Sequence, residues 1–141
     1  MKLPEKNPAK QLFKQFCDAY KKHDLNALLK MMTSDINMWG SGIDEYRVGL
    51  LDVETQLKRD WSQSEKAEIE VVSFVPAPEE AVWSEAICHA KVTIDGLRCS
   101  FPDLRGTIIV AKEKGEWKIA HMHASFPDYR NADNGSFPVK A

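Results

Sequence analysis

The chain has 141 residues, 43% of them hydrophobic and 28% charged, and its formal net charge is −2. These values predict a single globular domain that is large enough to bury an ordinary hydrophobic core. The sequence has no basic block and no run of about 18 apolar residues, so we expect neither nucleic acid nor a membrane as partner. The first residues lack the apolar core of a signal peptide, and we therefore expect a cytoplasmic protein.

The three cysteines, Cys17, Cys88 and Cys99, are odd in number and fit neither a CxxC pair nor a zinc set. We expect free thiols in a reducing compartment. No phosphate-cradling glycine loop or nucleotide fingerprint occurs, so no cofactor is predicted, and the cysteine spacing predicts no metal site.

The N-terminal part of the chain predicts two helices. Residues 1–8 contain two prolines and several charges and are expected to be a flexible leader. Apolar residues at helical spacing predict a helix over 9–23. Asp24 is the expected N-cap of a second helix over 25–32, which the polar residues 33–35 should end.

A short strand over 36–39 comes next and meets the turn Gly40-Ser41-Gly42. A third helix is predicted over 50–61, where apolar residues recur at intervals of three and four: Leu50, Val53, Leu57 and Trp61.

After residue 66 the apolar period changes from 3.6 to 2, which indicates strands. We predict strands over 67–75, 81–94, 97–112 and 117–127, with a bulge or bend at Pro102-Asp103. In the strand over 81–94, one face carries Val82, Ser84, Ala86, Cys88, Ala90, Val92 and Ile94, and the other carries Trp83, Glu85, Ile87, His89, Lys91 and Thr93. Residues 128–141 show no periodicity and are expected to form a tail.

This order of elements predicts an α+β domain over residues 9–127, in which three helices pack on a strongly curved mixed or antiparallel sheet. A curved sheet with a helical cover forms a cone that is open at one end. Cones of this kind are suited to hold a small-molecule pocket.

Two motifs give the chain a resemblance to a known family. Trp39–Gly49, WGSGIDEYRVG, resembles the glycine-rich turn that precedes the third helix in SnoaL-like members of the nuclear transport factor 2-like (cystatin-like) superfamily. Ile94–Gly96 and Gly115–Ser125 are similar to the closing hairpins of the association domain of calcium/calmodulin-dependent kinase II. The superfamily includes isomerases, cyclases, dehydratases, hydrolases and non-catalytic assembly domains, so the fold alone does not specify an activity.

The resemblance also implies which side chains face the pocket. In the kinase association domain, basic side chains line the cavity at the positions that match His89, Ile108 and Ala124. Only His89 keeps a polar group here. The resemblance therefore implies an apolar pocket wall of Ala120, Met122 and Ala124, with His89 as the principal polar group and first choice for acid–base work.

The closing strand has three alternative roles. Strict alternation places Trp117, Ile119, His121, His123 and Ser125 on one face. The two histidines could contribute to a metal site with His89 or Glu85, pack at a homodimer contact, or act in the pocket as a base or an anchor for an anion.

Ketosteroid isomerase chemistry provides a further comparison, because it needs a tyrosine on the first helix and a carboxylate base. Alignment places Phe16 at the tyrosine position and Gly40 at the base position, so we do not expect steroid isomerisation by that mechanism. Glu45 lies nearby and is a candidate carboxylate, although a helix cap is the alternative.

The remaining candidate ligand-binding residues are Trp39 and Trp61 at the mouth of the cone, Met122 and His123 on the last strand, and Arg105, which could instead pair with Glu85. We therefore predict a largely apolar pocket for an unknown small molecule, with His89 and Glu45 as candidate catalytic groups in an isomerase or dehydratase type of proton transfer. The alternative is a non-catalytic ligand-binding or homo-oligomerisation domain, most simply a homodimer.

Overall fold

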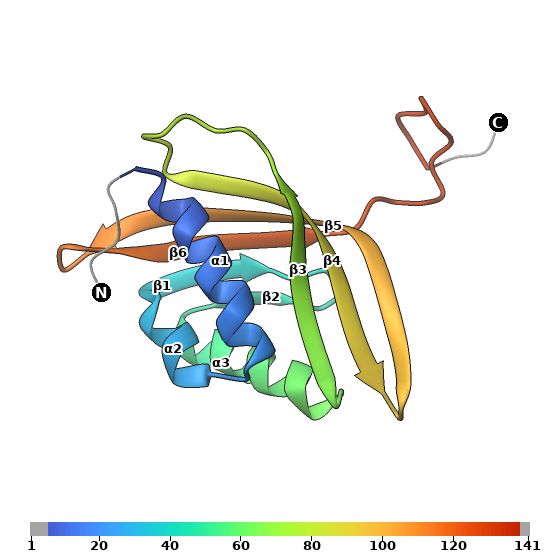
Figure 1. Cartoon of the computed structure of the whole chain (residues 1–141), viewed down its shortest axis with the longest axis horizontal. Coiled ribbons are helices and arrows are strands. Elements are labelled where there is room, and N and C mark those ends of the chain that lie inside the picture. Colours follow the sequence, from blue (N-terminus) through green and yellow to red (C-terminus); the bar gives the residue numbers. More distant parts are fainter. Residues whose placement is uncertain (1–5, 139–141) are drawn as a thin grey trace.

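The computed structural model describes residues 6–138 and shows three helices on one face of a six-stranded sheet (Figure 1). The elements are α1 Pro8–Lys21, α2 Leu25–Lys30, β1 Met32–Trp39, β2 Tyr46–Val48, α3 Leu50–Ser62, β3 Lys66–Phe74, β4 Trp83–Ile94, β5 Leu97–Glu113 and β6 Glu116–Ser125. The strand order is β2-β1-β6-β5-β4-β3, and the β1–β6 pair is parallel whereas the other pairs are antiparallel. The predicted fold class is confirmed.

The two ends of the chain fall partly outside the described residues. Of the predicted leader, residues 1–5 lie outside them, and Pro8 already begins α1. Of the predicted tail, residues 139–141 lie outside them. Within the described part, no helix is long and apolar enough to cross a membrane.

Local sequence signals explain where the first two helices begin. The Asn7 side chain accepts a hydrogen bond from the Lys10 backbone N–H at 3.0 Å, and Pro8 occupies the first turn of α1, where its missing N–H costs nothing. Asp24 caps α2 as predicted, with Oδ1 accepting from the Ala27 N–H at 3.1 Å.

The predicted end of the second helix is wrong, because residues 33–35 belong to β1. The Ile119 N–H donates to the Met31 carbonyl at 2.7 Å, so pairing with β6 begins directly after α2. The exposed Ser34 is held by the Glu113 carboxylate, which accepts from its N–H and its hydroxyl. Tertiary pairing here outweighs the turn preference of polar residues. Strand β2, with three residues, was not predicted.

A bulge at Ala120 changes the face on which the residues of β6 lie. Ile119 pairs with Val110 of β5, and His121 pairs with Ile109, so Ala120 has no partner in the ladder. As a result Ile119 and Met122 both point into the core, with 0% and 7% of their surface exposed. The predicted alternation of β6 is therefore wrong at Ile119. The face that was considered for a homodimer contact includes Ile119, which is a core residue.

A second bulge lies where it was predicted. Cys88 pairs with Leu104 and Ala90 pairs with Phe101, so Pro102 and Asp103 together oppose the single residue His89. Because the extra residue is in β5, the alternation of β4 continues through the bulge. Ser84, Ala86 and Cys88, which were predicted to share one face, all point into the core.

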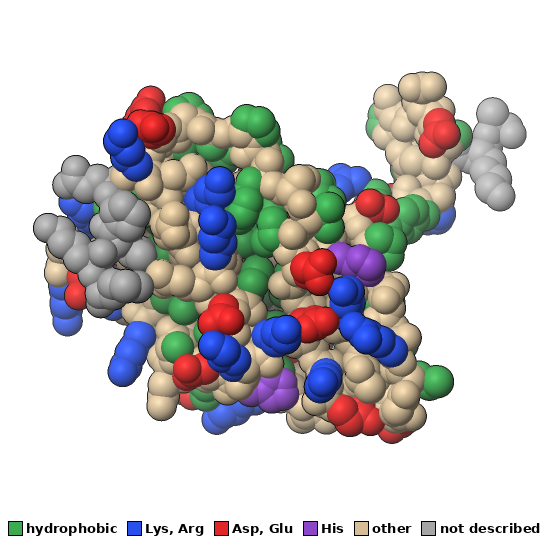
Figure 2. Space-filling model, viewed as in Figure 1, with side chains coloured by type: hydrophobic (Ala, Val, Ile, Leu, Met, Phe, Trp, Pro, Cys, Tyr) green, Lys and Arg blue, Asp and Glu red, His purple; other side chains and the backbone are tan. Residues whose placement is uncertain are grey.

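The core lies between α1 and the concave face of the sheet. Gly106 of β5 permits the close approach of the helix, since a Cβ atom there would lie 2.9 Å from Cζ of Phe13. On the face shown in Figure 2, basic and acidic side chains are interspersed rather than gathered into regions of one sign.

Candidate functional site

A cavity of about 410 Å³ lies between the helices and the concave face of the sheet. Most of its wall is apolar and comes from α1, β1, β3, β5, β6 and the residue that follows β6. These wall residues include Phe16, Met38, Ile69, Phe101, Met122 and Phe126. A cavity of this size with mostly apolar walls is typical of a small-molecule site.

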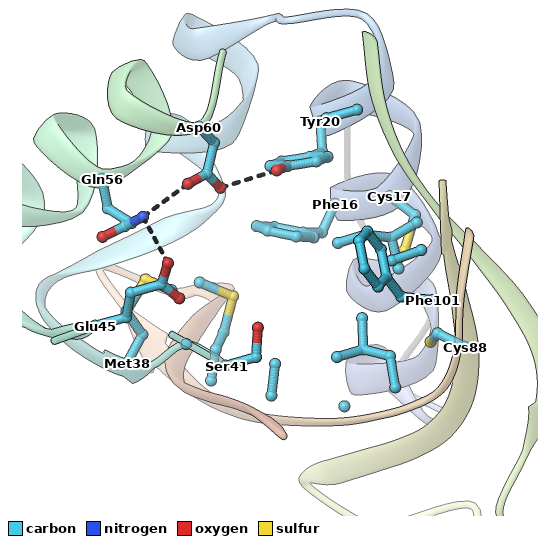
Figure 3. A pocket seen from close by; sticks show the side chains of 18 of the residues that line it. Phe16, Cys17, Tyr20, Met38, Ser41, Glu45, Gln56, Asp60, Cys88 and Phe101 are labelled. Carbon is cyan, nitrogen blue, oxygen red and sulfur yellow. Dashed lines mark hydrogen bonds between the residues drawn. The ribbon is translucent and has the colours of Figure 1, made fainter. Parts of the chain in front are cut away.

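The polar part of the wall is a chain of hydrogen bonds from α1 to the turn before β2 (Figure 3). The Tyr20 hydroxyl donates to Oδ2 of Asp60 at 2.8 Å. Nε2 of Gln56 donates to Oδ1 of Asp60 at 2.7 Å and to Oε1 of Glu45 at 3.2 Å. All four residues border the cavity.

Asp60 is the carboxyl group whose protonation is most altered by this environment. Burial raises its pKa, and the hydrogen bonds from Tyr20 and Gln56 oppose the rise only in part. Burial and the neighbouring Asp60 also raise the pKa of Tyr20, which therefore remains a hydroxyl donor at neutral pH. Trp61 packs behind Tyr20 with a ring-centroid distance of 6.0 Å and helps to hold it in place.

Gln56 has its amide orientation fixed by its neighbours. Its Nε2 lies between two carboxylate oxygens, which can only accept, so a flipped amide would place oxygen against oxygen. Oε1 is buried and has no hydrogen-bond partner among the described residues. Gln56 thus connects Glu45 and Asp60 although only 2% of its surface is exposed.

The glycine-rich turn folds around the carboxylate of Glu45. The Gly42 N–H donates to Oε2 of Glu45 at 2.9 Å. A Cβ atom on Gly40 would lie 2.1 Å from that same oxygen, so the turn tolerates no side chain there while Glu45 keeps its position. The glycines of the motif are therefore explained by the path of the Glu45 side chain.

Arg59 fixes the outer end of the network. It makes two hydrogen bonds to the carboxylate of Asp44, at 2.9 and 3.1 Å, and a longer one to Oε1 of Glu45 at 3.3 Å. The Arg59 guanidinium holds the pKa of the Asp44 carboxyl below its usual range. One arginine thus connects the turn to α3.

We expect Gly40→Ala to displace Glu45 from Gln56 without unfolding the domain, because the new methyl group would occupy the place of the carboxylate. The Gln56 side-chain amide resonances in an NMR spectrum should shift. Gly115→Ala is a control for adding a methyl group to a glycine away from the site. Its Cβ would meet no atom within 4 Å, and its φ of +81° strains the backbone, so it should destabilise the domain without shifting the Gln56 resonances. Unchanged Gln56 resonances in Gly40→Ala would contradict the described geometry.

The predicted site residues divide into two groups. Trp39, Glu45, Met122 and His123 border the cavity, and Trp39 stands at its mouth with 48% of its surface exposed. Trp61 does not border it and instead stacks on His23 at a ring-centroid distance of 4.8 Å.

His89 lies outside the cavity. The residues on either side of it, Cys88 and Ala90, border the cavity, and alternation along β4 turns His89 to the opposite face of the sheet. There it lies across from Glu70 in the β3–β4 ladder. The position implied by the resemblance is therefore not a pocket position in this chain.

Arg105 also lies outside the main cavity. It borders a shallow depression on the other face of the sheet, together with Glu85, Thr107, His123 and Ser125. The expected ion pair between Arg105 and Glu85 is not among the ion pairs of the described residues.

Sequence reasoning did not identify Tyr20, Gln56 or Asp60 as site residues. A signal was present: Val53, Gln56, Leu57 and Asp60 are spaced by three, one and three residues, so two polar residues occupy the buried stripe of α3. Buried polar side chains need hydrogen-bond partners. Here Gln56 and Asp60 bond to each other, and Asp60 also accepts from Tyr20.

The residues described by the structure contain no group of three His, Cys, Asp or Glu side chains placed to hold a metal ion. Cys17 and Cys88 both border the cavity as free thiols, and burial raises the pKa of Cys17 to about 12. A thiol with a raised pKa is a poor nucleophile, because the thiolate is the reactive form.

Residues 9–129 match the family described as SnoaL-like domain. The chain belongs to the SnoaL-like domain family. A comparison with curated proteins gave no significant match.

Solved structures of similar fold include proteins described as nuclear transport factor 2-like or as having a ketosteroid isomerase-like fold. An LEH-like epoxide hydrolase of Mycobacterium tuberculosis has a TM-score of 0.70 and 17% identity, over 89% of this chain and 87% of that one. A protein of the same organism, in complex with estradiol-17β-hemisuccinate, has a TM-score of 0.71 and 16% identity, over 85% and 94%.

A third structure is a Catenulispora acidiphila protein with a ketosteroid isomerase-like fold, in complex with trimethylamine. Its TM-score is 0.64 and its identity 12%, over 82% of this chain and 85% of that one. At these identities the likeness establishes the fold and no shared activity.

Proposed function

We propose that this SnoaL-like protein is an enzyme that moves a proton on a compact and mostly apolar small molecule, as an isomerase or a dehydratase does. The observation that supports the proposal is the position of Asp60. This carboxyl group borders an apolar cavity, is oriented by Tyr20 and Gln56, and has a pKa raised by burial.

The raised pKa bears on catalysis because a carboxylate that is disfavoured by burial is a stronger base than one in water. Glu45 is in a different environment, since the Gly42 N–H, Gln56 and Arg59 all donate to its carboxylate. These donors stabilise its charge. Asp60 accepts only from neutral groups, so it is the better placed of the two carboxylates to act as the base.

The structures of similar fold are in keeping with a small-molecule site. One is named as an epoxide hydrolase, and two are complexes with small organic molecules. Because the identities are low, these structures support only the statement that the ligand is a small molecule. The choice of Asp60 rests on the contacts in this chain.

The proposal is tested with 5-nitrobenzisoxazole, a neutral aromatic compound that reports on carboxylate bases. A base removes the proton on C3, the C–H electrons form the nitrile, and the N–O bond breaks to release a coloured phenolate. We expect the protein to cleave it faster than acetate at equal concentration. The rate should rise with pH through a midpoint above the usual aspartate pKa of about 3.9, because only ionised Asp60 accepts the proton.

Cleavage no faster than with acetate, at every pH at which the protein is folded, would contradict the proposal. That result would favour the alternative of a non-catalytic ligand-binding domain, which retains the cavity and does not transfer protons. Binding of the unreactive analogue 5-nitrobenzotriazole, measured by calorimetry, would then show whether the cavity accepts such molecules.

A further inference from the structure

The cavity has an imbalance of charge in its polar wall. Asp44, Glu45 and Asp60 form one connected network, and Arg59 is the cation that donates to its carboxylates. Arg47 donates to the backbone carbonyl of Asp44. The residues that border the cavity, within the described part of the chain, include no lysine and no arginine. The histidine among them, His123, is an exposed residue. With all three carboxyl groups ionised, the network carries two more negative than positive charges.

Asp60 is the member of the network without a cation against it. Its two oxygens accept from the neutral groups of Tyr20 and Gln56, and no ion pair involves it among the described residues. A carboxylate has about four acceptor sites, so these two bonds leave part of its capacity free. The side of Asp60 toward the cavity is therefore electrostatically attractive to positive charge.

Glu68 also borders the cavity and does not add to this imbalance. It is paired with Lys21 at 3.4 Å and with Arg98 at 3.8 Å, and it alternates with Ala67 and Ile69, which face inward. The attraction for a cation is therefore concentrated at the α1–α3 side of the cavity, where Asp60 lies.

Aromatic rings border the same space. Phe16 and Tyr20 are stacked with their centroids 6.0 Å apart, and Figure 3 shows both on α1, on the side that faces Gln56 and Asp60. Phe101 and Phe126 form a second pair, 6.2 Å apart, on the sheet side. Ring faces attract cations through their quadrupole, most strongly where water is excluded.

We propose that the ligand of this cavity carries a quaternary ammonium group on an apolar body. This rests on the proposed function and specifies its substrate class. A primary ammonium would pair directly with Asp60 and neutralise the base. A quaternary nitrogen has no N–H group, so it is held by the ring faces and the negative field and leaves Asp60 free to accept a proton from carbon.

Three probes of nearly equal shape separate charge from size: benzyltrimethylammonium, its neutral carbon isostere neopentylbenzene, and the anion benzylsulfonate. Affinities are measured by calorimetry or by ligand-observed NMR at neutral pH. We expect the cation to bind at least about tenfold more tightly than the neutral probe, from the cation–π and charge contributions. Benzylsulfonate should not bind measurably, and added salt should weaken binding of the cation alone.

Two variants locate the effect. Phe101→Leu removes a half-exposed ring face and keeps an apolar side chain, and should lower the affinity for the cation several-fold with little change for the neutral probe. Asp60→Asn removes the charge and should act in the same direction. Asp18→Asn is the matched control, because Asp18 lies exposed on α1 and pairs with Lys22; it should change neither affinity.

Equal affinity for the cation and the neutral probe, or no binding of the cation, would overturn the inference. Either result leaves the proposed function standing, because 5-nitrobenzisoxazole is neutral and its cleavage is measured separately. Equal losses of cation affinity in Asp60→Asn and Asp18→Asn would also overturn it, since the attraction would then come from overall charge rather than from the cavity.

Discussion

Asp60→Asn is expected to slow the cleavage of 5-nitrobenzisoxazole by roughly 10²- to 10⁴-fold, the range over which a positioned general base contributes to catalysis. An amide has no basic lone pair at neutral pH, so the variant loses proton abstraction and keeps the shape of the cavity. The measurement is the initial rate of phenolate release at a pH well above the midpoint of the wild-type profile.

The asparagine should be accommodated without unfolding. Its oxygen can accept from Gln56 in place of Oδ1, and its amide nitrogen can donate to the Tyr20 hydroxyl, which rotates to become an acceptor. Because burial raises the pKa of Asp60, ionised Asp60 opposes folding at neutral pH, and its neutral replacement removes that cost. The melting temperature should therefore not fall.

Asp18→Asn carries the same change of charge on the exposed side of α1, and its rate should equal that of the wild type. A wild-type rate in Asp60→Asn, or the same loss in both variants, would show that the proton goes to another group.

Ile119→Ala is expected to lower the free energy of unfolding by about 2–5 kcal/mol, as is usual for a large apolar residue replaced by alanine in a packed core. Ile119 is fully buried, and its strand lies between β1 and β5 in the middle of the sheet. The bulge at Ala120 turns Ile119 inward, so this variant also tests the register of β6. Urea unfolding followed by circular dichroism gives the value.

Ile109→Ala is the matched control on the neighbouring strand. Ile109 pairs with His121, and 39% of its surface is exposed on the face of the sheet away from the helices. Partial burial predicts a smaller loss, of about 1–2 kcal/mol. If Ile109→Ala cost as much as Ile119→Ala, both side chains would be equally buried, and the described register would be wrong.

Most of the fold could be predicted because its helices and strands follow from the local spacing of apolar residues. The stripe over Leu50–Trp61 predicted α3, and the alternation over 81–94 placed Cys88 and Ala90 on one face, as observed. The Pro102-Asp103 bulge was predictable as well, since proline cannot continue a central ladder.

The bulge at Ala120 could not be predicted in this way. It has no proline or glycine, and it arises where β6 meets strands on both sides at once. Because alternation has a period of two, one unrecognised bulge moves every later residue to the opposite face. For this reason the sequence placed Ile119 and His121 on the same face, whereas the structure separates them.

The site was harder to predict than the fold because its polar residues are far apart in the sequence. Tyr20 and Asp60 are 40 residues apart, and only the packing of α1 against α3 and the sheet brings them together. The resemblance pointed to His89, which lies on the opposite face of β4 from Cys88 and Ala90, the neighbours that border the cavity. The polar residues on the buried stripe of α3 were the stronger signal.

The most direct test is an experimental structure of the complex with 5-nitrobenzotriazole, whose ring N–H imitates the reacting C–H of the neutral substrate. We predict that the ligand lies between Phe16 and Phe101 and that this N–H donates to a carboxylate oxygen of Asp60. A ligand bound on the other face of the sheet beside Arg105 and His123, or one inside the cavity without a hydrogen bond to Asp60, would contradict the proposal.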